Sequence, residues 1–277
     1  EKYGNPSGIY KMASECRQAL ETVRKQIGKT LKVSAEEIYF TSGGTESDNW
    51  AIKSTAQRLK EKGKHIITSK IEHHAVLNSC AYLETQGFEV TYLDVDEWGC
   101  VRFDALQRAI RKDTILISIM YANNEVETIQ PIGQIGKIAK ENDIFFHTDA
   151  VQAYGQIPID VKRENIHLLS ASAHKFNGPK GVGFIYIDKR VPVMSYIHGG
   201  KQERNHVAGI VGMGKAAEIA FAAQKEREKR VQQMREYLMK KICEEIPYCR
   251  INGSVARRLP GNCNVSFQFI EGNELLL

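Results

Sequence analysis

The sequence predicts an α/β fold built on a mostly parallel sheet. Short runs of branched apolar residues alternate with amphipathic segments along most of the chain, and this alternation is typical of right-handed β-α-β units. Later, a polar-faced helix over about 205–243 leads to short strands over 248–252 and 264–269. This change of pattern predicts a large domain over residues 1–228 and the start of a smaller α+β C-terminal domain over 229–277.

The expected elements begin with a helix that Ser7 can cap. Its apolar residues from Ala13 to Ile27 recur at helical spacing, and Gly28 is expected to end it. Further helices are expected from about Thr45 and over residues 74–86, 104–111 and 132–142. Strands are expected over residues 38–41, 65–69, 88–93, 114–121, 144–149, 167–172 and 182–187. The last of these strands follows a tight turn, so it can run antiparallel to its predecessor.

Composition places the chain among ordinary globular proteins. Hydrophobic residues make up 42% of the 277 residues, and the net charge of +5 is spread along the chain, which does not indicate a nucleic-acid partner. No apolar run approaches the ~18 residues that a membrane span requires, and no signal peptide is recognisable. The six cysteines show no zinc spacing and are interpreted as reduced thiols of a cytoplasmic protein. Both ends of the chain look cut.

Polar clusters follow five of the predicted strands, where α/β sheets bind ligands. They lie at residues 43–46, 72–74, 121–125, 147–152 and 172–175. The Gly43-Gly44 turn could bind a phosphate or could be a plain helix cap. Asp149 could hold a protonated ring nitrogen or cap a turn. His73 and His74 could stack on a flat ring, transfer a proton or bind metal.

Lys175 is the strongest single indication of chemistry. It lies in "SASAHKFNGPKG", between a strand of small residues and a Gly-Pro turn. A free lysine has a pKa of about 10.4, so a lysine that forms a Schiff base benefits from desolvation and nearby positive charge. Ser172 and His174 can reach a phosphate, whereas Lys180 is expected to be solvated. With the glycine turn, Asp149 and a stacking histidine, these groups are the set that pyridoxal 5'-phosphate (PLP) requires.

Seven stretches of the chain, in order, resemble the cysteine desulfurases of the NifS/IscS type in the class-V aminotransferase group. They are "YGNPSG", "YFTSGGTESDNWAI", "IEHHAVL", "YANNEVETIQPI", "FHTDAVQAYGQIPIDV", "SASAHKFNGPKGVGFIYI" and "LPGNCNVSF". The resemblance implies a homodimeric PLP-dependent transferase of fold type I. Such an enzyme converts L-cysteine to L-alanine and an enzyme-bound persulfide, for iron–sulfur cluster assembly or other sulfur transfer to an acceptor such as a scaffold protein.

The resemblance also implies roles for individual residues. Lys175 would hold the cofactor as a Schiff base, and His73 would stack on the ring and transfer protons. Asp149 would pair with the pyridine nitrogen and Gln152 with the ring hydroxyl. Asn124 would help to hold the substrate carboxylate. The residues expected at the phosphate are Gly44, Thr45, Ser172 and His174.

The chain departs from the family pattern in three places. Glu127 stands where the family mostly has glycine. Residues 199–206 run directly into 207–212, without the threonine-containing segment that the family carries between them. The chain also ends before the loop with the persulfide cysteine and before the arginine that grips the substrate carboxylate, so none of its six cysteines is expected to be the nucleophile.

Three other functions are open at this stage. One is a selenocysteine lyase or another class-V PLP lyase, and a second is a chain that binds cofactor or partners without turnover. The third is a metal-dependent hydrolase that uses the strand-end residues His73, His74, His147, Asp149 and His174. This third function leaves Lys175 and the glycine turn without a role.

Overall fold

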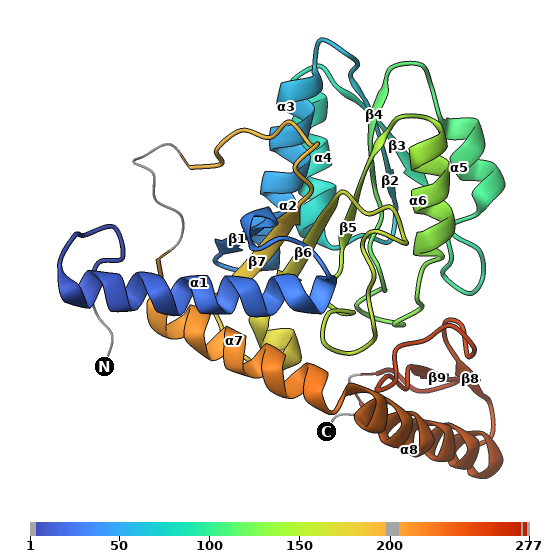
Figure 1. Cartoon of the computed structure of the whole chain (residues 1–277). Helices are drawn as coiled ribbons and strands as arrows, with labels where there is room; N and C mark the ends of the chain where they lie inside the picture. The colour runs from blue at the N-terminus through green and yellow to red at the C-terminus, as the bar shows by residue number, and fades with distance from the viewer. Residues whose placement is uncertain (1–3, 198–204, 273, 276–277) are drawn as a thin grey trace.

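A seven-stranded sheet lies between two layers of helices in the computed structural model, which describes residues 4–197, 205–272 and 274–275 (Figure 1). The strands are β1 (Ile38–Thr41), β2 (His65–Ser69), β3 (Glu89–Leu93), β4 (Thr114–Ser118), β5 (Phe145–Asp149), β6 (Leu168–Ser172) and β7 (Gly183–Ile187), in the spatial order β1-β7-β6-β5-β4-β2-β3. β7 is antiparallel to β1 and β6, and all other pairs are parallel. The predicted α/β class and the antiparallel strand are confirmed.

Helices cover both faces of this sheet (Figure 1). They are α1 (Lys11–Leu31), α2 (Gly44–Asn49), α3 (Thr55–Leu59), α4 (His74–Thr85), α5 (Phe103–Ala109), α6 (Ile132–Glu141), α7 (Val207–Ala222) and α8 (Gln224–Glu245). Adjacent strand residues such as Leu116 and Ile117 belong to different apolar clusters, one shared with α1, α5, α6 and α7 and the other with α3 and α4. The strands are therefore apolar on both sides, as buried parallel strands are.

The prediction for the first helix was wrong at both ends. α1 begins at Lys11, not directly after Ser7, and continues to Leu31. It ends because Lys32 adopts a left-handed conformation (φ 57°) and donates its N–H to the last carbonyls. Gly28 lies inside the helix, where a side chain would come within 2.9 Å of the Val33 carbonyl oxygen. This glycine serves close packing, not termination.

The predicted helix over 205–243 is two helices. α7 and α8 are separated at Ala223, whose φ of −117° and ψ of 21° leave the helical region. α7 is largely apolar and packs beside α1, whereas α8 is mostly polar (Figure 1). Helical spacing continues across this break, so periodicity alone does not reveal it.

The C-terminal part of the chain forms a second, small sheet. Its strands β8 (Cys249–Ile251) and β9 (Val265–Phe267) are antiparallel and lie beside α8, apart from the seven-stranded sheet (Figure 1). A division into domains at residue 228 stays a prediction. Within the described residues, no helix is both long enough and apolar enough to cross a membrane.

A buried aromatic cluster fixes the segments that lead into the site. The ring of Tyr154 lies 5.1 Å from that of Phe176, 4.9 Å from that of Phe184 and 5.2 Å from that of Phe221. Its hydroxyl is 2.7 Å from Thr30 Oγ1 in α1. The cluster thus joins the chain that follows β5 to the turn after β6, to β7 and to two helices.

Tyr154→Ala is expected to destabilise the protein by about 3–5 kcal/mol, because it leaves a large cavity in this cluster. Tyr154→Phe keeps the ring and is expected to cost about 1 kcal/mol, the value of one hydrogen bond. Urea unfolding measures both changes, and Tyr237→Ala, at a tyrosine with 66% exposure, is the matched control with almost no effect. Equal losses for the Phe and Ala variants would contradict the packing role.

Candidate active site

A cavity of about 260 Å³ lies at the carboxyl edge of the parallel strands. β7 is antiparallel to both of its neighbours, β1 and β6, so β1 and β6 run in the same direction. β1 therefore ends at the same edge of the sheet as β6, β5, β4 and β2. The cavity is lined by Gly44, Thr45, Asp48, His73, Met120, Ala122, Asn124, Asp149, Val151, Gln152, Ser172, His174 and Lys175. All nine site residues nominated from the sequence are in this set, so the fold brings them together.

Asp149 forms part of the cavity floor. It is the last residue of β5, and its Oδ1 accepts a 2.9 Å hydrogen bond from the Val151 N–H. Burial is the largest influence and raises the pKa of Asp149, although the Val151 N–H, His73 and Lys175 each act to lower it. The carboxyl group is therefore fixed in position and directed towards a cavity in which positive groups favour its charged form.

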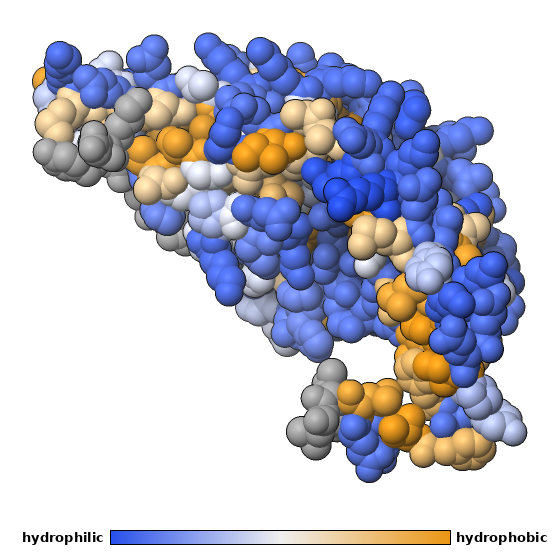
Figure 2. All heavy atoms as spheres, turned by 90° about the horizontal axis from the view of Figure 1, so that it is seen from below, coloured by the Kyte–Doolittle hydropathy of each residue, from blue (hydrophilic) through white to orange (hydrophobic). Residues whose placement is uncertain are grey.

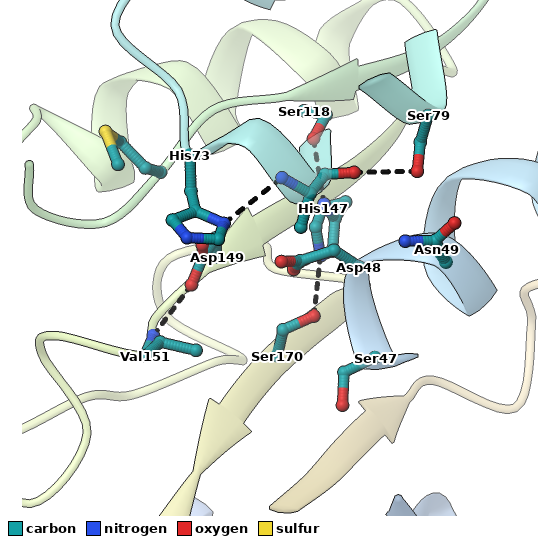
Figure 3. Close-up of polar contacts among 12 residues, drawn as sticks. Ser47, Asp48, Asn49, His73, Ser79, Ser118, His147, Asp149, Val151 and Ser170 are labelled. Carbon is teal, nitrogen blue, oxygen red and sulfur yellow. Dashed lines mark hydrogen bonds and ion pairs between the residues drawn. The ribbon is translucent and has the colours of Figure 1, made fainter. Parts of the chain in front are cut away.

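His73 is held by the start of α4. It is the N-cap residue, and its Nδ1 accepts a 3.1 Å hydrogen bond from the Ala75 N–H. Nδ1 therefore carries no proton when this bond forms, and the proton of the neutral ring is on Nε2. Figure 3 shows the ring beside Asp149.

Lys175 lies on the short 3-10 turn Ala173–Phe176, directly after β6. Lys175 is exposed, so the described part of the chain does not provide the desolvation from which a Schiff-base lysine benefits. The turn carries the lysine out of the buried sheet edge and into the open cavity. His174, beside it, is favoured in its neutral form, because burial lowers its pKa and the charges of Lys175 and Lys180 lower it further.

The Gly43-Gly44 turn is closely packed against the rest of the site. Gly43 has a φ of 150°, and a Cβ on Gly44 would come within 2.6 Å of the Val151 side chain. Ser172 Oγ lies 2.9 Å from His174 Nδ1 on the opposite side of the turn. A hollow of about 300 Å³ beside the turn is lined by Ser42, Gly43, Gly44, Thr45, Glu46, Ser172, His174, Lys180 and Gly181. Lys180 is exposed there, as predicted.

A buried polar cluster that was not predicted extends inwards from the cavity, which one of its members, Asp48, lines (Figure 3). His147 Nδ1 is 2.8 Å from Ser118 Oγ, and its Nε2 is 3.0 Å from Ser170 Oγ. Burial lowers the pKa of His147 to about 3, so the ring is neutral. Asp48 Oδ1 lies 3.6 Å from His147 Nε2. The one sequence signal for Asp48 was its place one helical turn after Gly44.

Glu72 belongs to the same cluster. Its carboxyl group accepts hydrogen bonds from Ser69 Oγ at 2.6 Å and from the Met120 N–H at 3.0 Å. Burial raises the pKa of Glu72 to about 8, despite these two donors. Glu72 therefore carries its proton through much of the neutral range.

The arrangement argues against a metal-dependent hydrolase. Both ring nitrogens of His147 are engaged by serine hydroxyls, which leaves neither for a metal. Among the described residues, no three His, Cys, Asp or Glu side chains form a group that could hold a metal ion. The histidines at the strand ends instead have separate partners.

The loop that carries Asn124 is held from two sides. Asn123 Nδ2 donates to the Ile71 carbonyl at 3.0 Å, which ties this loop to the segment before His73. The side chains of Asn262 and Asn264 both donate to the Glu125 carbonyl, at 3.0 and 3.2 Å. The asparagines of the "PGNCNV" stretch thus connect the C-terminal part of the chain to the cavity.

Glu127 continues this connection. Its carbonyl accepts the Leu259 N–H at 3.1 Å, and its backbone is left-handed with a φ of 49°. Burial raises the pKa of its carboxyl group, and the charges of Arg258, Lys175 and Arg235 lower it. The left-handed backbone explains why glycine suits this position. The positive charges of the neighbouring Arg258, Lys175 and Arg235 favour the ionised carboxylate of a glutamate here.

The comparisons with known proteins agree with this site. The family model "Aminotransferase class-V" matches residues 1–277. Cysteine desulfurase IscS of Methanosarcina thermophila is 56% identical over 283 aligned positions, which cover 100% of this chain and 70% of that protein. Cysteine desulfurase IscS of Dictyoglomus turgidum is 53% identical, covering 100% of this chain and 72% of that protein.

Solved structures give the same result. A "NifS-like protein" superposes with a TM-score of 0.95 at 41% identity, covering 99% of this chain and 77% of that chain. "SspA in complex with cysteine" superposes with a TM-score of 0.85 at 39% identity, covering 96% and 76%. The chain belongs to the class-V aminotransferase family, whose members use PLP. Within that family it is a cysteine desulfurase of the IscS type.

Glu127→Gly is expected to be more stable than Glu127→Ala by about 1 kcal/mol, because only glycine adopts the left-handed backbone without a penalty. Both substitutions remove the carboxylate, so their difference isolates the backbone contribution. Chemical denaturation at one pH provides the measurement. An Ala variant as stable as the Gly variant would contradict the left-handed conformation.

Stability should also report the buried Glu72. The folded protein keeps this proton between about pH 4.5 and about 8, a range in which the unfolded chain has released it. Wild-type is therefore expected to lose stability relative to Glu72→Gln as the pH rises through this range, by up to about 1.4 kcal/mol per unit. Denaturation curves at several pH values test this, with the exposed Glu97→Gln as control. Parallel stability profiles for wild-type and Glu72→Gln would show that Glu72 is ionised in the fold.

Proposed function

We propose that this chain holds PLP in the 260 Å³ cavity and uses it to take sulfur from L-cysteine, leaving L-alanine and a protein-bound persulfide. The observation that carries the proposal is the convergence of nine nominated residues, from five separate strand ends, on one cavity. Convergence of this kind requires the sheet topology as well as the motifs. The family's use of PLP supports the choice of cofactor.

The residues present fit PLP. At one end of the cavity, the close-packed Gly43-Gly44 turn leaves room for an anion against backbone N–H groups, and Thr45, Ser172 and His174 would hold the phosphate. On the floor, Asp149 would pair with the ring nitrogen. Gln152 would contact the ring hydroxyl, and Lys175 would bind the cofactor covalently.

Once bound, PLP supplies an electron-withdrawing ring that stabilises negative charge at the substrate carbon attached to the amino group. The protein's own residues then divide the remaining work. His73 would stack on the ring and transfer protons, and the hydrogen bond from the Ala75 N–H to its Nδ1 fixes the orientation of the imidazole. Asn124 would hold the substrate carboxylate. Its Nδ2 already donates one hydrogen to Glu125 Oε1 at 2.7 Å, which leaves a second for the substrate.

L-Cysteine is the proposed substrate because the relatives are named cysteine desulfurases and SspA was solved with cysteine. The thiolate that accepts the sulfur is proposed to lie outside the six cysteines of this sequence. Cys16, Cys80 and Cys100 are buried, and none of the six is among the cavity-lining residues. Burial raises the pKa of Cys80 to about 12, which removes its nucleophilic form.

We further propose a homodimer that passes sulfur to an acceptor protein such as an iron–sulfur scaffold. Figure 2 shows apolar side chains among hydrophilic ones on the lower face, and more of them around the C-terminal part. Met234, Tyr237 and Leu238 of α8 are among those exposed. Sedimentation of the protein with and without PLP tests the dimer, and a monomer under both conditions would exclude it.

Lys175→Ala is expected to abolish covalent attachment of PLP, because among the described residues no other one that lines the cavity has a primary amine. Borohydride reduction of the PLP-treated protein, followed by peptide mapping, should label Lys175 in wild-type and no residue in the variant. Lys180→Ala is the matched control and should be labelled like wild-type. Labelling of Lys180, or of no lysine in wild-type, would make the assignment wrong.

A further inference from the structure

Three buried carboxyl groups lie close together at the cavity, although a single protonated ring nitrogen requires only one; Asp48 and Asp149 line the cavity and Glu72 does not. Asp48 is 1% exposed, Glu72 5% and Asp149 7%. No Lys or Arg of the described segments forms an ion pair with any of the three. Like charges at such a buried site cannot all be present at once, so the protons must be distributed unequally among the three groups.

The surroundings distinguish Asp149 and Glu72. Asp149 lines the cavity and accepts a backbone N–H, and His73 and Lys175 both act to lower its pKa. Glu72 does not line the cavity, and both its donors, Ser69 Oγ and the Met120 N–H, lie inside the protein. Asp149 is thus the group best placed to carry a negative charge. An ionised Glu72 would place its charge inside the protein, away from the cavity.

Asp48 is the least compensated of the three. Its Oδ1 is buried and has no hydrogen-bond partner. The nearest ring nitrogen, His147 Nε2, lies 3.6 Å away and is engaged by Ser170 Oγ. A charged carboxylate with an unpaired oxygen in the interior costs several kcal/mol, whereas the neutral acid avoids most of that cost.

We propose that Asp48 is a positioning residue that keeps a proton throughout the working pH range and thereby leaves Asp149 as the only charged carboxylate against the cofactor ring. Ser170 links the two residues. Its backbone lies in register with Asp149 on the neighbouring strand, and its hydroxyl is shared between His147 and Asp48. The neutral chain Asp48–Ser170–His147–Ser118 would hold the floor in place without adding a second negative charge.

The charged groups around Asp48 favour this distribution. Asp149 and Glu72 act on Asp48 through their charges, and His147 Nε2 lies 3.6 Å from its Oδ1. His73, His174 and Lys175 line the same cavity as Asp48. Burial contributes most to raising the pKa of Asp48, the charge of Asp149 comes next, and Ser170 opposes both. The charge on ionised Asp149 therefore favours the protonated form of Asp48, and a neutral Asp48 in turn favours the charged form of Asp149.

Infrared spectroscopy of the cofactor-free protein tests the proton directly. The carbonyl stretch of a protonated carboxylic acid is separate from the stretches of carboxylates. The wild-type minus Asp48→Asn difference is expected to contain one protonated-acid band of constant intensity from pH 6 to 9. Glu72→Gln is the matched control, and its band should fade as the pH passes about 8. Loss of a carboxylate band in Asp48→Asn would overturn the proposal.

A measurement on wild-type protein keeps the proposal testable if Asp48→Asn does not fold. With aspartate carrying ¹³C in its carboxyl group, one NMR signal should keep the shift of a protonated acid from pH 6 to 9. The absence of such a signal would also overturn the proposal. Neither measurement involves PLP, so failure here is distinguishable from failure of the proposed function.

The effect of Asp48 on the PLP ring rests on the proposed function, and its measurement needs the PLP-loaded protein. The pH midpoint of the cofactor's absorption change should stay within about half a unit of wild-type in Asp48→Asn, whereas Asp149→Asn should shift it by about one unit or more. A shift of one unit or more in Asp48→Asn would show that Asp48 carries charge, and the proposal would be wrong.

Discussion

The reversed strand β7 is the feature on which the site depends. It is antiparallel to both β1 and β6, so β1 runs in the same direction as the parallel strands. The Gly43-Gly44 turn after β1 consequently lies beside Ser172 and Lys175, which follow β6. If β1 ran antiparallel to β6, the glycine turn would lie at the opposite edge of the sheet. One strand direction therefore decides whether the anion site and the lysine share a cavity.

The groups around this cavity are held by a shell of polar contacts that reaches far along the chain. Asn123 fixes the loop before His73, and two asparagines near residue 263 fix the loop that carries Asn124. Each contact is a side-chain amide on a backbone carbonyl, which sets a position without adding charge. The C-terminal part of the chain therefore contributes to the site although none of its residues lines the cavity in the described structure.

Sequence was sufficient for what depends on local pattern. Apolar runs predicted the seven strands, and polar residues after strand ends predicted nine of the residues that line the cavity. It did not locate the left-handed Lys32 or the break at Ala223, because a lysine or alanine at these positions carries no distinctive signal. Asp48 was missed because a helical aspartate is normally exposed, and only the packing of α2 on the sheet shows it to be buried.

The charges around the cavity are divided between its two ends. Lys175 and Lys180 lie at the end with the glycine turn, whereas Asp149 lies on the floor with neutral His147 behind it. A flat ligand with an anionic group at one end and a cationic ring nitrogen at the other would bind in one orientation, because reversal would put like charges together. A second ionised carboxylate behind Asp149 would exceed the single positive charge of such a ring. The burial of Asp48 without a charged partner is consistent with a floor that provides one negative charge and no more.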